Sequence, residues 1–340
     1  MLIGMVFGNG YGSQAGAWRM PGVDPTGFTN FDTMVRYAQL AEHGKFQFLF
    51  MPDFPALRAD IATDAQQQGA WLHDQASGRF ADLAKIKPIN LRGRHLATSG
   101  PLPLPPSEQG QPVIFQAGGG DQGLEVAGRY ASGVIGAVFT MEDARAQRMA
   151  LRDAAKRAGR DPDEIKFFAG LMTTIAPDRR AALDRRIAMS GFSFEPRVGY
   201  LGQMLGLALD PAQLGEPLTK AQLAAARPSR QDPRSTYALK VASEGWSLRD
   251  VLAHGVIDYH PMIVGPAVEA ADYMQTWFEA GAADGFWLCP DVYEDGLPPL
   301  VEELAPILRE RGLFHRDYQG ATLRDHLGVP AQYGRDPRLQ

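Results

Sequence analysis

The stretch VIFQAGGGDQGLEVAGRYASGVIGAVFTMED, residues 113–143, decides the fold class of this chain. It opens with an apolar run typical of a buried strand, passes through glycines and continues as a helical pattern. A second strand pattern, residues 133–139, leads into a long helix that we expect to begin at Thr140, because Asp143 completes the spacing of a capping box. Repeated strand–helix alternation predicts a mainly parallel sheet covered by helices.

The same alternation extends outward in both directions. Strand patterns occur at residues 2–7, 46–51, 165–175 and 286–288, with amphipathic helical patterns among them. These patterns leave two α/β architectures open, a doubly wound sheet and a (β/α) barrel. Residues 191–261 interrupt the alternation with a segment rich in Pro, Gly and Gln that contains two short helical pieces. A compact domain rarely keeps so long an insertion without a use, so we expect a lid or a subunit contact there.

Composition restricts the class of protein. The chain has 340 residues, of which 45% are hydrophobic and 21% charged, so it can bury a large core. A net charge of -5 disfavours nucleic acid or an acidic membrane surface as a partner. One cysteine, Cys289, allows no internal disulfide, and the sequence has no apolar run of the roughly 20 residues that a membrane span needs. We expect a cytoplasmic protein that binds neither nucleic acid nor membrane.

The glycines after the 113–117 strand have three interpretations. Gly118, Gly120 and Gly123 spell the G-x-G-x-x-G of a dinucleotide-binding turn, and the acid Glu142 follows the next strand. The same spacing suits a generic phosphate-binding turn or a purely structural turn, since all three place free amides at a helix N-terminus. A lone motif of this kind is weak, so the local sequence does not choose among them.

Other chemical signatures are scarce. The chain has no H-E-x-x-H or C-x-x-C spacing and no G-x-S-x-G nucleophile elbow, so we expect no metal site. His260, near the C-terminal end of the 191–261 segment, has two interpretations: a group that contacts substrate or donates a proton, or an ordinary loop histidine.

Several separated stretches together resemble one family. They are AWRMPG (17–22), YAQLAEHGKFQFLFMPD (37–53), SGRFADLAKIKPINLRGRHLATSGPL (77–102), EQGQPVIFQAGGGDQG (108–123), GAADGFWL (281–288) and RGLFHRDYQGATLRDHLG (311–328). This set resembles the flavin-dependent monooxygenases of the bacterial luciferase family, in the branch of the nitrilotriacetate and dibenzothiophene sulfone enzymes. The resemblance implies an α/β fold, the (β/α)8 TIM barrel, which binds reduced FMN delivered by a separate flavin reductase. It also implies oxygenation of a small organic substrate, such as a sulfur- or amine-containing compound, with O2, and we expect a homo-oligomer.

The resemblance also implies which residues meet the cofactor. The turn after the fifth barrel strand, with Gly119, Gly120 and Asp121, would meet the flavin phosphate. Asp53 matches the acid that ends the second strand near the flavin. The catalytic group is not identified, and His260 is the candidate. Gly120 stands where the family usually has serine, so a phosphate-binding hydroxyl is lost.

A larger departure is an internal gap. After LFMPDFPALRAD (49–60) the chain runs through IATDAQQQG (61–69) directly to AWLHDQASGRF (70–80), without a third and fourth βα unit. At about 30 residues per unit, plus loops, roughly a hundred residues are missing. We therefore expect one domain, 1–340, built as a barrel that lacks about two units in its N-terminal half, with 191–261 as an insertion or lid and 313–340 as a C-terminal tail. The alternatives to an impaired oxygenase are a non-catalytic remnant of the family and an NAD(P)-binding oxidoreductase that uses residues 118–123.

Overall fold

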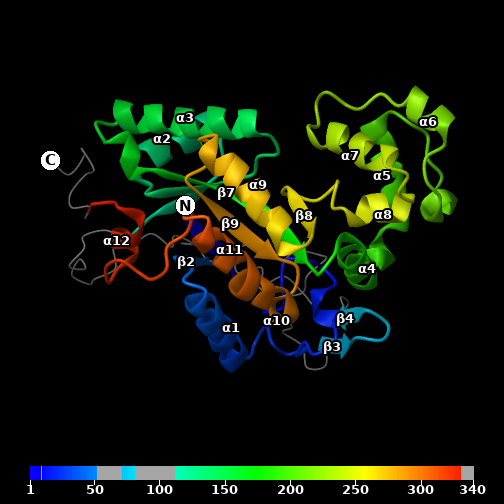
Figure 1. The fold of residues 1–340 in the computed structure, drawn as a ribbon, viewed down its shortest axis with the longest axis horizontal. Helices are drawn as coiled ribbons and strands as arrows, with labels where there is room; N and C mark the ends of the chain where they lie inside the picture. Colours follow the sequence, from blue (N-terminus) through cyan, green and yellow to red (C-terminus); the bar gives the residue numbers. More distant parts are fainter. Residues whose placement is uncertain (9, 52–70, 82–111, 331–340) are drawn as a thin grey trace, which may run out of the picture. The chain divides into compact units, whose positions relative to one another are not determined.

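A computed structural model of the chain describes residues 1–8, 10–51, 71–81 and 112–330. Two compact units are present, and the larger comprises Met1–Met51 and Val113–Val329 (Figure 1). The described part of the smaller unit is an antiparallel hairpin of β3 (Trp71–Asp74) and β4 (Arg79–Ala81). Asp53 lies outside the described residues.

A parallel sheet of seven strands forms the centre of the larger unit. Its strands are β1 (Leu2–Val6), β2 (Phe48–Phe50), β5 (Phe115–Ala117), β6 (Gly133–Gly136), β7 (Lys166–Ile175), β8 (Met262–Gly265) and β9 (Gly285–Pro290). The order is β2-β1-β9-β7-β6-β5, and β8 pairs with the second half of β7. The six strands predicted from sequence are confirmed. The β8 strand was not predicted, because its four residues directly follow the irregular 191–261 segment and do not continue a strand–helix alternation.

The strand order identifies the architecture. Strands β5, β6, β7, β9, β1 and β2 lie side by side, so the last strand of the sheet in sequence pairs with the first, as barrel closure requires. A doubly wound sheet would instead reverse its order at a switch point beside the dinucleotide turn. The Gly118–Gly123 turn follows β5, which is an edge strand of the described part of the sheet, so the doubly wound interpretation is wrong. Among the described residues no strand pairs with the outer edges of β2 and β5, where barrel strands three and four would lie.

Helices cover the outer face of this arc (Figure 1). They are α1 (Phe31–His43), α2 (Asp121–Tyr130), α3 (Met141–Arg157), α9 (Ala267–Glu279), α10 (Tyr293–Gly296), a π-helical turn (Leu300–Leu304) and α11 (Ala305–Glu310). Their apolar stripes pack on alternate strand residues such as Ile3, Phe167 and Phe286. Asn30 caps α1, and Thr140 caps α3 by accepting from the Asp143 amide, as the sequence predicts. None of the helices in the described ranges is long and apolar enough to cross a membrane.

Aromatic rings fill the inner face of the arc. Phe48 of β2 packs on Phe115 of β5 and Phe168 of β7, with ring centroids 4.7 and 5.1 Å from that of Phe48. A Cβ at Gly4 would overlap the Phe48 ring, so only glycine admits this ring beside β1. The two edge strands are therefore joined across the interior by side chains, even though they share no backbone hydrogen bond.

The C-terminal segment closes the amino end of the arc. Leu327 of α12 (Leu323–Leu327) and Val329 pack against Phe48 and Phe168. Upstream, the Tyr318 hydroxyl donates to the carbonyl of Phe46 at 2.9 Å, just before β2. The stretch 311–328, one of those that resemble the luciferase-like family, thus lies at the floor of the barrel, on the side away from the carboxyl ends of the strands.

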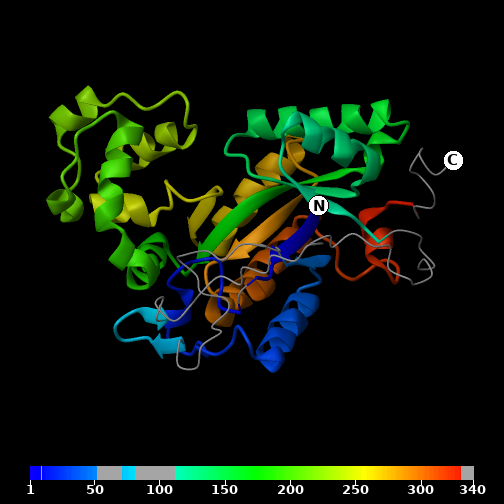
Figure 2. The same ribbon diagram turned by 180° about the vertical axis from the view of Figure 1, so that it is seen from behind.

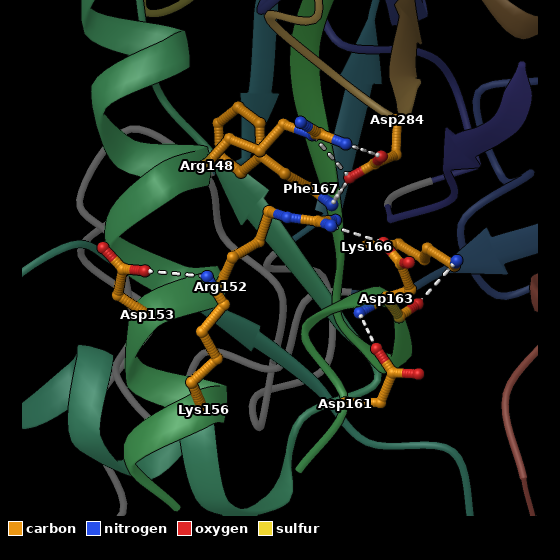
Figure 3. Close-up of polar contacts among 9 residues, drawn as sticks. All are labelled: Arg148, Arg152, Asp153, Lys156, Asp161, Asp163, Lys166, Phe167 and Asp284. Carbon is orange, nitrogen blue, oxygen red and sulfur yellow. Dashed lines mark hydrogen bonds and ion pairs between the residues drawn. The ribbon is translucent and has the colours of Figure 1, made fainter.

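A polar clamp joins α3 to the amino ends of β7 and β9 (Figure 3). Arg148 donates to both oxygens of Asp284, at 3.1 and 2.7 Å. The same carboxylate accepts from the backbone amide of Phe167 at 2.8 Å. One carboxylate therefore fixes the helix and both central strands at the end opposite to the candidate site.

The insertion is more regular than its composition predicts. After α4 (Arg179–Ser190) it holds α5 (Val198–Leu205), α6 (Lys220–Ala225), α7 (Arg234–Ser243) and α8 (Leu248–Ala253), in place of two short helical pieces. Its buried residues, among them Leu201 and Val251, share one core with Met172 of β7, Met262 of β8 and Cys289 of β9. Figure 2 shows the insertion beside the end of β7 and β8.

Candidate active site

The carboxyl ends of the strands gather the loops that follow β1, β5, β6, β7 and β9, because all these strands are parallel. The turn after β5 is rich in glycine and exposed. Gly118 has φ +109°, a conformation that favours glycine, and Gly120 is the N-cap of α2 with no side chain to cap the helix. A Cβ at Gly120 would meet no atom of the described residues within 4 Å. The first amides of α2 therefore face an uncrowded, exposed position.

Two glutamines border this turn. The Gln116 amide nitrogen donates to the carbonyl of Ala117 at 2.6 Å, and its buried Oε1 has no hydrogen-bond partner among the described residues. The Gln147 side chain of α3 approaches Gly119. The turn thus presents neutral donors and free amides, with Asp121 as the acid in the first turn of α2.

His260 lies at a second position, where the insertion returns to β8. Its side chain is 4% exposed, and its ring packs edge-on against Trp287 with centroids 5.2 Å apart. A Cβ at Gly170 would overlap the imidazole, so the absence of a side chain on β7 makes room for the ring. Both ring nitrogens of His260 and the Nε1 of Trp287 are buried without a hydrogen-bond partner in the described structure. Buried polar atoms of this kind are uncommon and mark a place where a ligand or water can bind.

Burial sets the protonation state of His260. Desolvation lowers the pKa of its imidazole to about 4. The ring is therefore neutral at pH 7, and it can donate one hydrogen bond and accept another but cannot act as an imidazolium acid. This favours the substrate-contacting interpretation of His260 over proton donation from a charged ring.

Arg234 connects the insertion to the barrel near His260. Its guanidinium donates to the carbonyls of Ile257 and Asp258 at 3.0 and 3.2 Å and to the Tyr200 hydroxyl at 2.6 Å. It also lies over the Phe139 ring, 5.3 Å from the centroid, on the loop after β6. One side chain thereby joins α5, α7, the segment before His260 and a carboxyl-end loop of the barrel.

The predicted site residues occupy two places. Gly119, Gly120 and Asp121 lie on the turn after β5, and His260 lies on the inner face beside β7 and β9. Sequence reasoning missed Trp287 as a site residue, because an apolar strand pattern does not tell which face points inward. The available signal was alternation: Phe286 and Leu288 pack outward, so the residue between them faces the interior.

The parallel arc, its inward aromatic rings and its open carboxyl-end turn define a (β/α)-barrel protein. The chain belongs to the luciferase-like monooxygenase family, whose model matches residues 70–284. It is 30% identical over 275 residues to N-acetyl-S-(2-succino)cysteine monooxygenase of Bacillus subtilis (strain 168). The aligned region covers 78% of this chain and 61% of that protein. It is 32% identical over 279 residues to dibenzothiophene-sulfone monooxygenase of Rhodococcus erythropolis, and the aligned region covers 80% of this chain and 60% of that protein. The chain thus spans about three fifths of the length of these relatives.

Solved structures support the same fold. EDTA monooxygenase (EmoA) from Chelativorans sp. BNC1 superposes with a TM-score of 0.69 at 21% identity, covering 97% of this chain and 99% of that chain. Long-chain alkane monooxygenase (LadA) superposes with a TM-score of 0.61 at 19% identity, covering 96% and 95%. At these identities the likeness concerns the fold alone.

Proposed function

We propose that this chain is the oxygenase component of an FMNH2-dependent two-component monooxygenase, whose affinity for flavin is reduced by the shortened barrel. The observation that carries the proposal is the open, uncapped turn after β5 in a chain of this family. The relatives are monooxygenases by name, and one is a "component A", which supports a separate flavin reductase as partner.

The turn after β5 fits the phosphate of FMN. Amides at the start of a ten-residue helix attract an anion, and the open space at Gly120 leaves room for phosphate oxygens. Gly119, Gly120 and Asp121 would hold that phosphate through their backbone, and we assign Asp53 to the same cofactor by resemblance. Reduced FMN supplies the electrons for activation of O2, while the protein supplies binding and orientation.

The inner face would receive the substrate. The rings of Trp287 and Phe50, 5.7 Å apart, offer an apolar surface, and His260 with Trp287 offers two N–H groups for an acceptor atom. A small organic compound with a sulfur- or amine-containing group suits this combination. The insertion, residues 191–261, acts as a lid that keeps water from this face.

The wider organisation follows from the same proposal. We assign residues 1–340 to one barrel domain, with residues 313–340 as its C-terminal tail. We expect a cytoplasmic homo-oligomer that binds neither nucleic acid nor membrane.

A specific observation favours a non-catalytic remnant of the family as the second candidate. The described sheet has no strand beyond the free edges of β2 and β5, and Gly120 offers no hydroxyl. A hydrogen bond to a charged group contributes roughly 1.5–3 kcal/mol, so the loss of two or three weakens binding by about 3–9 kcal/mol. A site of micromolar affinity would then bind FMN with a dissociation constant of about 0.1 mM or higher.

Titration of the purified chain with FMN and with FMNH2 tests the proposal. Two variants at one position sharpen it, since Gly120→Ser and Gly120→Asp both cap α2 and fit the open space. Gly120→Ser is expected to tighten FMN binding by roughly tenfold through one added hydrogen bond, whereas Gly120→Asp weakens it through charge repulsion. Equal FMN affinities for both variants would show that the turn after β5 does not contact the flavin phosphate. Micromolar binding by the unmodified chain would show that the shortened barrel keeps its full affinity.

A further inference from the structure

Arg186 has the largest residue volume among the fully buried side chains of the described structure. It lies on α4 and is 1% exposed, and its Nη2 donates to Oδ2 of Asp258 at 2.6 Å. Its Nε and Nη1 have no hydrogen-bond partner among the described residues. A buried guanidinium is costly unless it is paired, so the Asp258 carboxylate is essential to its placement.

Asp258 lies in the short turn that leads to His260. The Asp258 amide donates to the carbonyl of Gly255 at 3.0 Å, and Gly255 has φ +75°, which shapes the turn. On the other side of His260, the Pro261 carbonyl accepts from the Met172 amide of β7 at 2.9 Å. His260 thus lies between two fixed points: the Asp258 ion pair precedes it, and the first hydrogen bond between the β7 and β8 segments follows it.

The other arginines of α4 behave differently. Arg179 pairs with Glu269, Arg180 with Asp184 and Asp250, and Arg185 with Asp291 and Asp295. None of these pairs involves the turn before His260. Buried ion pairs stabilise little compared with apolar replacements of similar volume, so the best-supported use of such a pair is to specify one geometry.

We propose that Arg186 is a positioning residue for His260: its ion pair with Asp258 holds the 255–260 turn so that the imidazole stays over Gly170 and against Trp287. This inference rests on the proposed function only in the role given to His260. The geometric part, from Arg186 to the ring position, stands without it.

The first experiment reads the ring directly and needs no activity. NMR titration of the labelled histidines in the full chain gives the pKa of His260, assigned with His260→Asn. In Arg186→Met the turn loosens, water reaches the ring, and the pKa rises from about 4 towards the ordinary value of 6.5. Arg186→Lys, which keeps a cation for Asp258, restores part of the low pKa. An unchanged His260 pKa in Arg186→Met overturns the proposal.

Two controls separate positioning from general loss of stability. Arg180→Gln removes a partly exposed ion pair of the same helix, and Leu201→Ala opens the insertion core without touching the turn. Both are expected to leave the His260 pKa at its wild-type value, and a rise as large as that in Arg186→Met would overturn the proposal. If Arg186→Met does not fold, Arg186→Met/Asp258→Asn removes both charges and leaves no unpaired ion, and the same rise is expected.

A double-mutant cycle connects the ring to turnover. With a sulfone or an amine as probe substrate and FMNH2 supplied, Arg186→Met is expected to lower kcat/KM at least tenfold, and to lower it no further in a His260→Asn background. Equal effects in both backgrounds would show that Arg186 does not act through His260. Absence of any wild-type turnover would refute the proposed function alone, because the NMR readout still decides the positioning role.

Discussion

Two histidines of the insertion, His254 and His260, are buried in a neutral state. Nδ1 of His254 lies 2.7 Å from the carbonyl of Asp250, and burial lowers the pKa of both His254 and His260. A histidine with a lowered pKa contributes stability that is complete above pH 6.5 and is lost as the pH falls through the folded pKa, here towards about 4 for His260. We expect the free energy of unfolding to fall by about 3 kcal/mol between pH 6.5 and about pH 4, because the unfolded chain protonates this histidine before the folded chain does. Urea unfolding at pH 7.5 and 4.5 measures the loss.

The His260→Asn variant is the control for that measurement. Since it has no titrating ring at this position, its unfolding free energy should depend less steeply on pH than that of the wild type. Parallel pH profiles for the two proteins would contradict the assignment.

Gly170 has no side chain, and the His260 ring occupies the space that this leaves. In Gly170→Ala the new Cβ would overlap the His260 ring, so the ring must leave its position against Trp287. We expect a loss of about 1–3 kcal/mol in the free energy of unfolding, typical of overpacking. The matched control is Gly199→Ala in α5, where a Cβ meets nothing within 4 Å and the helix should gain up to about 1 kcal/mol. Destabilisation of equal size in both variants would contradict this account.

At the scale of elements, the carboxylate of Asp284 carries the contact between α3, β7 and β9. Its side chain is 17% exposed, and it is hydrogen-bonded to Arg148 and to the Phe167 amide. We expect Asp284→Ala to lower the free energy of unfolding by about 2–4 kcal/mol, since it removes the acceptor of the Arg148 guanidinium and of the Phe167 amide. The exposed pair of Arg129 and Glu125 is the contrast, and Glu125→Ala should cost less than about 0.5 kcal/mol. Thermal or urea denaturation compares the two variants.

At the scale of the whole molecule, the insertion shares one hydrophobic cluster with residues of β7, β8 and β9, distinct from the core between the sheet and its outer helices. Leu201 and Val251 of the insertion pack in the same cluster as Met172 and Cys289 of the sheet. Because neither part can lose its partner without exposing apolar surface, we expect both to unfold in one cooperative transition. Calorimetry combined with hydrogen exchange checks this. An earlier, separate transition confined to residues 191–261 would show instead that the insertion folds and opens independently.

The local elements were largely predictable. Short, mainly apolar runs and the caps at Asn30 and Thr140 sufficed for six strands and the main helices, because these signals act within a few residues along the chain. The β8 strand was missed because it is short and is stabilised by pairing with β7, a contact distant in sequence. The insertion was judged by composition, which does not reveal helices held by a common core.

The sequence by itself determined the family, the alternation of strands and helices, and the glycine turn at residues 118–123. The tertiary structure alone decided that this turn follows an edge strand of a barrel arc, which excludes the dinucleotide interpretation of the glycines. It also decided that His260 and Trp287 meet over Gly170, and that Arg186 reaches the turn before His260 through Asp258. The physical reason is that strand order and inward or outward orientation arise from hydrogen bonds and packing between residues far apart in the chain. Period and composition record only which face of an element is apolar.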